Sequence, residues 1–528
     1  MPFLQLHAVP SWLNGILIGY PISIAKLPCL DRTFLRVTFG PMRFLPLLLL
    51  LLPAALTGQT LQQQLQSVAT ANGLVGMSVV TTCGTAVQDV VHTGKRNLAQ
   101  NADVDDSTRY RIASISKLVT AIGLMRLHEQ GLFGLDDDVS AALGFTFRNP
   151  AFTGTPITYR MLLSHTSSFQ DGTGYSDFLD ATYSNAPPPP ISELAMPGGD
   201  WYTTNMWRTE IPGSYFAYSN ANFGILGTLI EALSGLRFDV YMRQQVLLPL
   251  DIHGSFNVQD LPNVADLAVL YRNSTPQADN FNGVMPPAPD LGQYTIGTNG
   301  LYFGPQGGLR VSALELARFA ILLNNEGTYN GTVLLQPTTI ALMLGNEWIW
   351  NGSNGDNYYG LFRSWGLGVH RITAQAGGDI VFPGTAMFGH AGEAYGLISD
   401  LYVDPATGFG LVFITNGYTP GNAYAFGASS AFYGVEEEVY DAIDQYAVPG
   451  CASTSIAPRE ATDPLILFGD RVRWNGSVPV MITLHDVTGR VVAHFSLAPG
   501  AERPVQAGNY VVRYTGAKGT GTRVWCAF

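Results

Sequence analysis

The chain has 528 residues, so length alone allows several domains, and 46% hydrophobic with 13% charged residues is a globular composition. The formal net charge of −12 opposes contact with nucleic-acid phosphates, and we therefore expect no nucleic-acid partner. The acidity itself indicates only solubility.

The N-terminal region predicts a secretion signal that does not begin at the first residue. Met42 and Arg43 precede a leucine-rich run that ends at Leu52 and is followed by small residues. This pattern is typical of a secretory signal, whereas a membrane-spanning helix needs about 20 apolar residues. We interpret residues 1–41 as an over-extended reading frame or an unusual leader, and residues 42–58 as the signal of a secreted or cell-surface protein.

Residues 59–448 are predicted to form an α+β domain. We expect a hairpin within residues 76–91, and an irregular insertion from Asp171 to Pro212 that forms part of a substrate rim. Apolar spacing and capping residues predict helices over residues 115–129, 222–233 and 312–324, and the first of these is expected to be amphipathic.

The first of these helices starts at Ser114 and carries Lys117 one turn later, a Ser-x-x-Lys pattern. One helical turn places a hydroxyl and an amine on the same face. A serine becomes a nucleophile when a neighbouring group takes its proton, and a buried lysine with a lowered pKa suits that task. Chance copies are common, as Ser23 to Lys26 shows, so the other motifs must support the prediction.

A Tyr-Ser-Asn sequence, Tyr218 to Asn220, precedes the second predicted helix. We expect Tyr218 to act as general base and acid, with its phenolate stabilised by Lys117, and Asn220 to hold a substrate amide or the lysine. A second copy, Tyr183 to Asn185, runs into a polyproline segment and lacks a following helix, so we favour Tyr218.

His390 and Gly392 lie in a His-Ala-Gly sequence ahead of a β-rich segment. Strands are predicted over residues 395–403 and 408–415. Beyond them, residues 449–463 are predicted to be a linker, and residues 464–528 a small all-β sandwich.

Three cysteines lie outside the leader. Cys451 and Cys526 are candidates for a disulfide in an oxidising compartment, with Cys83 as a buried thiol, and three unpaired cysteines are an equal alternative. The scattered histidines show no metal-ligand spacing, so we expect neither a metal nor an organic cofactor.

The order Ser-x-x-Lys, Tyr-x-Asn and His-x-Gly resembles the β-lactamase-related serine hydrolases. These include class C β-lactamases, D-alanyl-D-alanine carboxypeptidases, D-amino-acid amidases and esterases. The resemblance implies an antiparallel sheet flanked by helices, with a helical subdomain. It covers nearly all of residues 60–445, with further matches at residues 162–167, 211–213, 306–309, 366–368 and 389–392.

The resemblance also implies roles for single residues. Ser114 is acylated, and Lys117 and Tyr218 share its proton. The oxyanion hole combines the N–H groups of Ser114 and Glu393, the residue directly after Gly392.

Two histidines occupy family-like positions. His390 stands where a lysine commonly helps to bind a substrate carboxylate, and a histidine is mostly neutral at pH 7. This favours an esterase or D-peptidase over a potent β-lactamase. His165 is expected to be a structural hydrogen-bonding residue.

The C-terminal region resembles a type IX secretion sorting domain at residues 486–492, 507–513 and 523–524. Such β-sandwiches direct passage across an outer membrane and are commonly removed, which implies outer-membrane secretion machinery as a partner. The usual Tyr-Pro-Asn-Pro opening is missing, and a carbohydrate-binding or structural β-module is the alternative.

Together these patterns predict a secreted serine hydrolase that forms an acyl-enzyme with small-molecule or peptide substrates. Esters and D-amino-acid amides or peptides, including peptidoglycan fragments, are the expected substrate classes. The alternatives are a non-catalytic relative that binds cell-wall peptides, and a true β-lactamase.

Overall fold

The computed structural model describes residues 60–448, Cys451 and, in the C-terminal part, residues 465–468, 471–474, 479–486, 490–498, 501–506, 508–516 and 519–527. The predicted leader, the signal and the linker apart from Cys451 lie outside the described residues. Within those residues, no helix has both the length and the apolar character needed to cross a bilayer.

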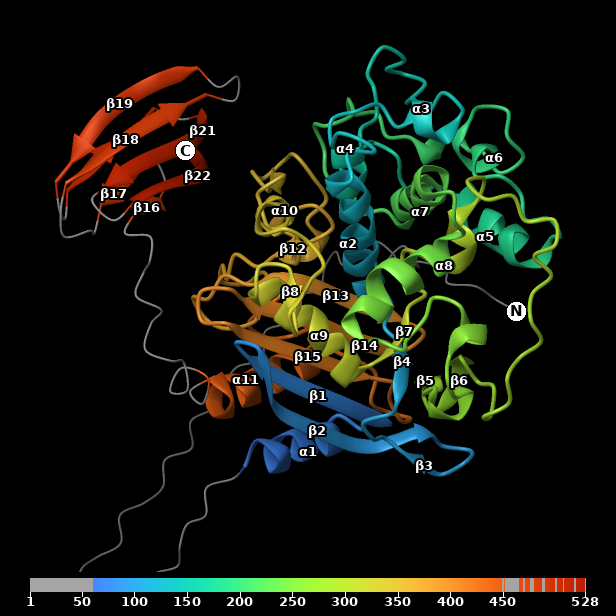
Figure 1. Ribbon diagram of the computed structural model, residues 1–528. Helices are drawn as coiled ribbons and strands as arrows, with labels where there is room; N and C mark the ends of the chain where they lie inside the picture. The colour runs from blue at the N-terminus through green and yellow to red at the C-terminus, as the bar shows by residue number, and fades with distance from the viewer. Residues whose placement is uncertain are drawn as a thin grey trace, which may run out of the picture.

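An antiparallel sheet forms the centre of the main domain (Figure 1). Its strand order is β10-β11-β12-β13-β14-β15-β1-β2-β3. The strands are β1 (Gly76–Cys83), β2 (Ala86–Asn97), β3 (Ala102–Asp103), β10 (Trp348–Ile349), β11 (Ser364–Trp365), β12 (His370–Arg371), β13 (Phe388–Ala394), β14 (Leu397–Asp404) and β15 (Phe409–Thr415).

Alternating side chains of the central strands supply two separate cores. Val80 of β1 and Leu401 of β14 belong to the larger core, whereas Val79 and Tyr402, their sequence neighbours, belong to the smaller one. Because neighbouring residues of a strand point to opposite faces, strands covered on both faces are apolar throughout.

Helices cover both faces of the sheet. On the smaller core lie α1 (Leu61–Ala71) and α11 (Gly434–Tyr446). On the larger core lie α2 (Ile115–Glu129) and α9 (Ala313–Asn324). Nearly every residue of α2 is buried, so this helix is not amphipathic as predicted but passes through the interior.

A helical region packs beside α2 (Figure 1) and includes α7, which contacts both α2 and α4. Its helices are α3 (Ser140–Leu143), α4 (Tyr159–Leu163), α5 (Gly174–Ser184), α6 (Ser192–Ala195), α7 (Asn220–Ser234) and α8 (Phe238–Met242), and α10 (Pro337–Met343) lies later in the chain. The insertion from Asp171 to Pro212 is therefore not irregular as predicted, because α5 and α6 lie within it.

Short elements complete the main domain. The one-turn helices are η1 (Thr204–Met206), η2 (Arg243–Leu247), η3 (Leu248–Leu250), η4 (Val258–Asp260), η5 (Val264–Asp266), η6 (Gly300–Phe303) and η7 (Tyr358–Gly360). The small strand pairs are β4 (Arg109–Arg111) with β7 (Arg310–Ser312), β5 (Leu270–Arg272) with β6 (Thr275–Ala278), and β8 (Thr328–Tyr329) with β9 (Thr332–Val333).

The C-terminal region forms two further sheets with orders β16-β17-β20 and β19-β18-β21-β22 (Figure 1). Val472 and Trp474 of one sheet share a core with Ile482 and Leu484 of the other. The strands are β16 (Leu465–Phe468), β17 (Arg471–Trp474), β18 (Val480–His485), β19 (Val491–Leu497), β20 (Glu502–Pro504), β21 (Gly508–Gly516) and β22 (Gly519–Ala527).

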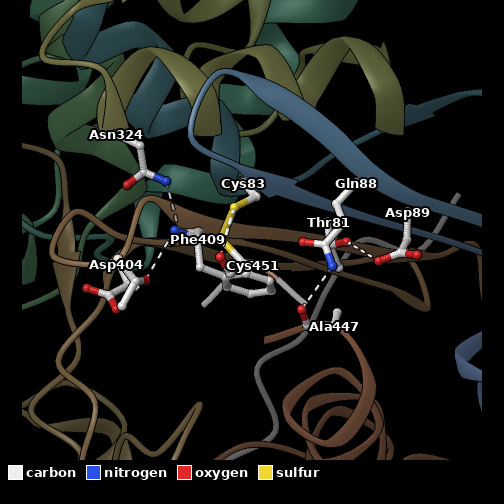
Figure 2. Close-up of a disulfide and its surroundings, with 10 residues drawn as sticks. Thr81, Cys83, Gln88, Asp89, Asn324, Asp404, Phe409, Ala447 and Cys451 are labelled. Atoms are coloured by element: carbon white, nitrogen blue, oxygen red, sulfur yellow. Dashed lines mark hydrogen bonds between the residues drawn. A yellow bond between two sulfur atoms is a disulfide. The ribbon is translucent and has the colours of Figure 1, made fainter. Parts of the chain in front are cut away.

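A disulfide joins Cys83, at the end of β1, to Cys451 (Figure 2). Beside it, Gln88 of β2 donates a hydrogen bond of 2.9 Å to the carbonyl oxygen of Ala447, just after α11. The pairing is therefore neither the predicted Cys451–Cys526 bond nor three free thiols. It also fixes Cys451, expected in the linker, to the main domain.

Candidate active site

Ser114 lies at the junction between β4 and α2. Ala113 has a φ of 48°, a left-handed conformation that turns the chain sharply into the helix. Ser114 is the N-cap residue, but its side chain makes no capping hydrogen bond. Its hydroxyl is thus available at a partly exposed helix N-terminus, where negative charge is favoured.

Lys117 is fully buried one turn beyond Ser114. Its Nζ donates to Ser114 Oγ at 2.9 Å, to Asn220 Oδ1 at 2.8 Å and to the carbonyl oxygen of Gln306 at 2.9 Å. Burial lowers the pKa of Lys117 to about 7, although the Asp171 carboxylate opposes this shift. A sizeable fraction of the amine is therefore neutral near pH 7.

Asn220 is the first residue of α7, and Asp171 holds it in place. Asp171 Oδ2 accepts hydrogen bonds from the backbone N–H and the side-chain Nδ2 of Asn220, at 3.1 and 2.8 Å. Asp171 Oδ1 accepts from Ser219 Oγ and from the Ala221 N–H. One carboxylate thus caps α7 and orients the amide that contacts Lys117.

Sequence analysis missed this role of Asp171 and placed it only at the start of an insertion. The free N–H groups of a helix starting near Asn220 signal that an acceptor is required. The sequence does not indicate which of many acidic residues supplies it.

The Nζ atom of Lys117 lies over the aromatic ring of Tyr218, 4.8 Å from the ring centroid. Burial raises the pKa of Tyr218 above its ordinary value, although a hydrogen bond with the Ser114 side chain opposes the shift. The ring stacks on Phe362 with centroids 5.1 Å apart. Tyr218 is therefore a neutral phenol held close to both Ser114 and Lys117.

His165 holds the Tyr-Ser-Asn segment in place through contacts with Ser219 and Tyr218. Its Nδ1 accepts a hydrogen bond of 3.1 Å from the Ser219 N–H, and its ring centroid lies 4.5 Å from that of Tyr218. Burial lowers the pKa of His165 well below its ordinary value, and nearby Lys117 lowers it further. This geometry fits the structural hydrogen-bonding role expected for His165.

His390 lies on β13, with its ring centroid 6.1 Å from that of Tyr218. It is 1% exposed, and its Nδ1 is hydrogen-bonded to the carbonyl oxygen of Ala391. Burial and then the Lys117 charge lower the pKa of His390 well below its ordinary value. The imidazole is therefore neutral at pH 7.

Gly392 of β13 brings the backbone of this strand against Ser114. A Cβ atom on Gly392 would lie 3.1 Å from the Ser114 nitrogen and 2.7 Å from the Ile112 carbonyl oxygen. Only glycine leaves room for this close approach. Nearby, Ser399 of β14 donates a hydrogen bond of 2.9 Å to Ile112 O.

The backbone N–H of Glu393 points away from β14. Met387 O accepts from the Ile372 N–H, so Met387 directs its polar groups to the β12 side, and β13 pairs with β14 without a bulge. Since these groups alternate along a strand, Glu393, six residues later, points to the same side. Its N–H therefore points away from β14, beyond the residues that pair with β12 and one residue after Gly392, which lies against the Ser114 nitrogen. The Glu393 carboxylate accepts a hydrogen bond from the Tyr433 hydroxyl.

The structure thus brings Ser114, Lys117, Tyr218, Asn220, His390 and Gly392 around one point, with the backbone of Glu393 beside them. The second Tyr-Ser-Asn copy is different: Tyr183 lies in α5 and is half exposed. Among the described residues, no group of three or more His, Cys, Asp and Glu side chains could hold a metal ion.

Comparison with known proteins identifies the family. Residues 59–431 match the family model described as Beta-lactamase. Penicillin-binding protein 4 of Amycolatopsis lactamdurans is 24% identical over 314 residues, 58% of this chain and 72% of that protein. The D-alanyl-D-alanine-carboxypeptidase/endopeptidase AmpH of Escherichia coli K12 is 24% identical over 279 residues, 52% of this chain and 66% of that protein.

A solved structure shares the fold. The D-amino acid amidase of Ochrobactrum anthropi SV3, complexed with L-phenylalanine amide, superposes with a TM-score of 0.53 at 19% identity, over 73% of this chain and 99% of the amidase. The predicted fold class, an antiparallel sheet flanked by helices with a helical region and a small β-domain, is confirmed. With its family model matched over most of its length, this chain belongs to the β-lactamase family and is a serine hydrolase.

Proposed function

We propose that this serine hydrolase is secreted, that Ser114 is its nucleophile, and that it acts on esters or on D-amino-acid amides and peptides, including peptidoglycan fragments. The observation that carries this proposal is the environment of Lys117. Two fixed carbonyl oxygens, Asn220 Oδ1 and Gln306 O, take two of its three hydrogen-bonding positions. The third faces Ser114 Oγ.

This arrangement suits a neutral amine as the base. The two N–H groups of neutral Lys117 donate to the two carbonyl oxygens, which leaves the nitrogen lone pair directed at the Ser114 hydroxyl. In acylation, Ser114 Oγ bonds to the substrate carbonyl carbon while its proton moves to Lys117 Nζ. The carbonyl electron pair moves to oxygen, where the N–H groups of Ser114 and Glu393 stabilise it.

Tyr218 then serves as a proton donor. Its raised pKa keeps it a neutral phenol, so it protonates the leaving alcohol or amine as the carbonyl re-forms. Lys117 returns a proton to the phenolate, which leaves the amine neutral again. Water repeats the sequence at the acyl-enzyme and releases the acid. This differs from the expected role of Tyr218 as the first base.

The substrate classes rest on His390 and on the relatives. A buried neutral imidazole cannot supply the charge with which a lysine binds a carboxylate at this position, which favours esters and D-amino-acid amides over β-lactams. The similar AmpH is named as a D-alanyl-D-alanine carboxypeptidase and endopeptidase, and the structural neighbour as a D-amino acid amidase. Both names support substrates with D-configured residues.

Secretion is supported by the predicted signal at residues 42–58 and by the Cys83–Cys451 disulfide, because such bonds persist in oxidising compartments. We propose that the C-terminal sandwich directs passage across an outer membrane. N-terminal sequencing of protein recovered from culture medium is expected to start near Gln59. A start at Met1 would contradict the proposal.

The nucleophile is tested by intact-mass analysis of the full chain after exposure to a p-nitrophenyl ester and, separately, to a fluorophosphonate. Wild type and Ser67→Ala, a control at an exposed serine on α1, are expected to carry one adduct and to release p-nitrophenol. Ser114→Ala is expected to do neither. Adduct formation on Ser114→Ala would overturn the assignment.

A further inference from the structure

Two arginines face each other across the short strand pair beside the active site. Arg111 of β4 pairs in register with Arg310 of β7. The Asp279 carboxylate bonds Arg310 through both oxygens, to Nε at 3.0 Å and to Nη2 at 2.8 Å. Like charges directly opposite each other repel, and Asp279 neutralises Arg310 while the strand pair supplies no carboxylate to Arg111.

Arg111 has no carboxylate of its own within the described residues. The salt bridges there include Arg96, Arg109 and Arg310 but not Arg111. Its Nε donates to the Gly307 carbonyl oxygen at 3.2 Å, and its guanidinium lies 5.1 Å from the ring centroid of Tyr395. Burial lowers the pKa of Arg111, but Tyr395, Asp279 and Tyr183 together raise it by more, with a hydrogen bond to the Tyr395 side chain contributing, so the charge is retained.

Both contacts of Arg111 adjoin groups at the reacting centre. Gly307 follows Gln306, whose carbonyl oxygen holds Lys117. Tyr395 is three residues beyond Gly392, which lies against the Ser114 nitrogen. The guanidinium, which has no carboxylate partner among the described residues, therefore lies along one side of the nucleophile and not at a remote surface.

Unpaired polar atoms lie on the same side. The buried Tyr175 hydroxyl and Gln306 Oε1 make no hydrogen bond of normal length, although the two side chains are neighbours. Tyr175 also lies near Tyr395, which adds to the rise in the pKa of Tyr175 that burial and Asp171 cause. The Tyr175 and Gln306 side chains interact with each other at longer than hydrogen-bond distance, so this side presents a polar surface that suits a polar ligand.

The position of the proton donor distinguishes the side of the nucleophile that holds the leaving group from the side that holds the acyl group. The leaving group must depart next to its proton donor, Tyr218, which lies beside His390 toward the start of β13. Arg111 and Tyr395 lie beyond the opposite end of this strand. We propose that Arg111 binds a carboxylate carried by the acyl part of the substrate, so that preferred substrates have an anionic acyl group.

This inference rests on the proposed function, since it names the substrate class of the same site. An arginine suits the task because its planar fork can bind both oxygens of a carboxylate. The neutral His390 leaves Arg111 as the cation that selects an anionic substrate. The enzyme then selects a negative charge on the acyl part of the substrate instead of on its leaving group.

The test compares two p-nitrophenyl esters of equal length, one of adipic acid with a free terminal carboxylate and one of adipamic acid with a terminal amide. The uncatalysed rate is subtracted for each. For wild type, kcat/KM is expected to be about 10- to 100-fold higher for the carboxylate ester, the range for hydrogen bonds to a charged group. Equal values would overturn the inference and leave the proposed function intact.

Single substitutions test whether Arg111 causes the preference for the carboxylate ester. Arg111→Gln is expected to remove the preference while retaining turnover of the amide ester. Arg318→Gln, which loses the same charge at the Asp251 salt bridge, is expected to keep it. A preference that survives in Arg111→Gln would overturn the inference.

A second variant acts in the opposite direction and decides the matter if Arg111→Gln does not fold. Asp279→Asn removes the negative charge nearest to both arginines, and is expected to increase the preference for the carboxylate ester. An unchanged or reduced preference would contradict the inference. If wild type hydrolyses neither ester and Ser114 takes no fluorophosphonate, the proposed function itself fails.

Discussion

The two faces of the large sheet each bury ionisable groups, with opposite consequences. On the α2 face, burial lowers the pKa of Lys117 to about 7. On the α11 face, burial raises the pKa of Asp400, on β14, to about 7, and that of Glu436, on α11, well above its ordinary value. In each case the interior disfavours the charged form.

The two faces differ in the hydrogen-bond partners that they give to these buried groups. Lys117 has three hydrogen-bond partners held by separate elements. Both oxygens of Asp400 lack a hydrogen bond of normal length, and the neighbouring group is a second carboxyl, Glu436. The same desolvation therefore leaves an amine that can accept a proton at neutral pH on one face, and on the other face it is expected to make stability depend on pH.

The largest effect is expected from Lys117→Met, which removes the proposed base but keeps an apolar side chain of similar length. kcat/KM should fall about 10²- to 10⁴-fold, the usual contribution of a positioned acid or base. Because the neutral amine is the active form, wild-type kcat/KM should rise as pH increases through about 7, and the variant should lose this rise. Lys95→Met, at a surface salt bridge with Asp103, is the control. A variant that keeps the wild-type pH profile would show that Lys117 is not the base.

A substitution on the α11 face is expected to lower the stability of the main domain without changing the activity of the folded protein. Cys451→Ala opens the bond that holds the end of the main domain to β1, and should lower the free energy of unfolding by about 2–4 kcal/mol. Urea denaturation without reductant measures this loss. Cys83→Ala should have the same effect, and kcat of the folded protein should not change. An unfolding midpoint that equals wild type would contradict the expected contribution.

Asp400→Asn should change how stability depends on pH. With a raised pKa, folded Asp400 binds a proton that the unfolded chain releases between about pH 4 and 7, so wild-type stability should fall as pH rises through this window. The variant should be more stable than wild type by up to about 4 kcal/mol at pH 8, since the shift spans about three pKa units and each is worth about 1.4 kcal/mol. Urea denaturation at pH 5 and pH 8 tests this, with Asp441→Asn, at an exposed residue of α11, as control. Equal stability at pH 8 would refute the assigned cost.

The smallest effect is expected from Asp171→Asn, which loosens the orientation of Asn220. We expect kcat to fall about tenfold, within the 10- to 100-fold range for outer-shell partners. The Asp171 charge raises the pKa of Lys117, so its removal should move the pH-rate midpoint below that of wild type. Asp177→Asn, at an exposed residue of α5, should leave the midpoint unchanged. A midpoint that does not move would mean that Asp171 has only a structural role.

Local signals in the sequence predicted much of this architecture. The helix predicted over residues 115–129 has those bounds, and α9 has the expected capping box between Ser312 and Glu315. The hairpin of β1 and β2 and the strands after His390 were also expected. Each of these depends on residues that are close in the chain.

Features that depend on distant contacts were not predictable in this way. The amphipathic pattern expected of α2 was wrong, because other elements surround the helix and bury polar Ser116 and Thr120 as well. Asp171 acts on a helix that starts 49 residues later. The disulfide joins positions separated by 368 residues, and the pairing depends on where α11 ends.

This long-range bond also determines what happens when the backbone is cut. A single proteolytic nick between Cys83 and Cys451 leaves two pieces that migrate together on a non-reducing gel. A cut after Cys451 instead releases the C-terminal region as a separate chain. Both cysteines of the disulfide precede the C-terminal strands, so removal of the C-terminal region leaves this bond intact.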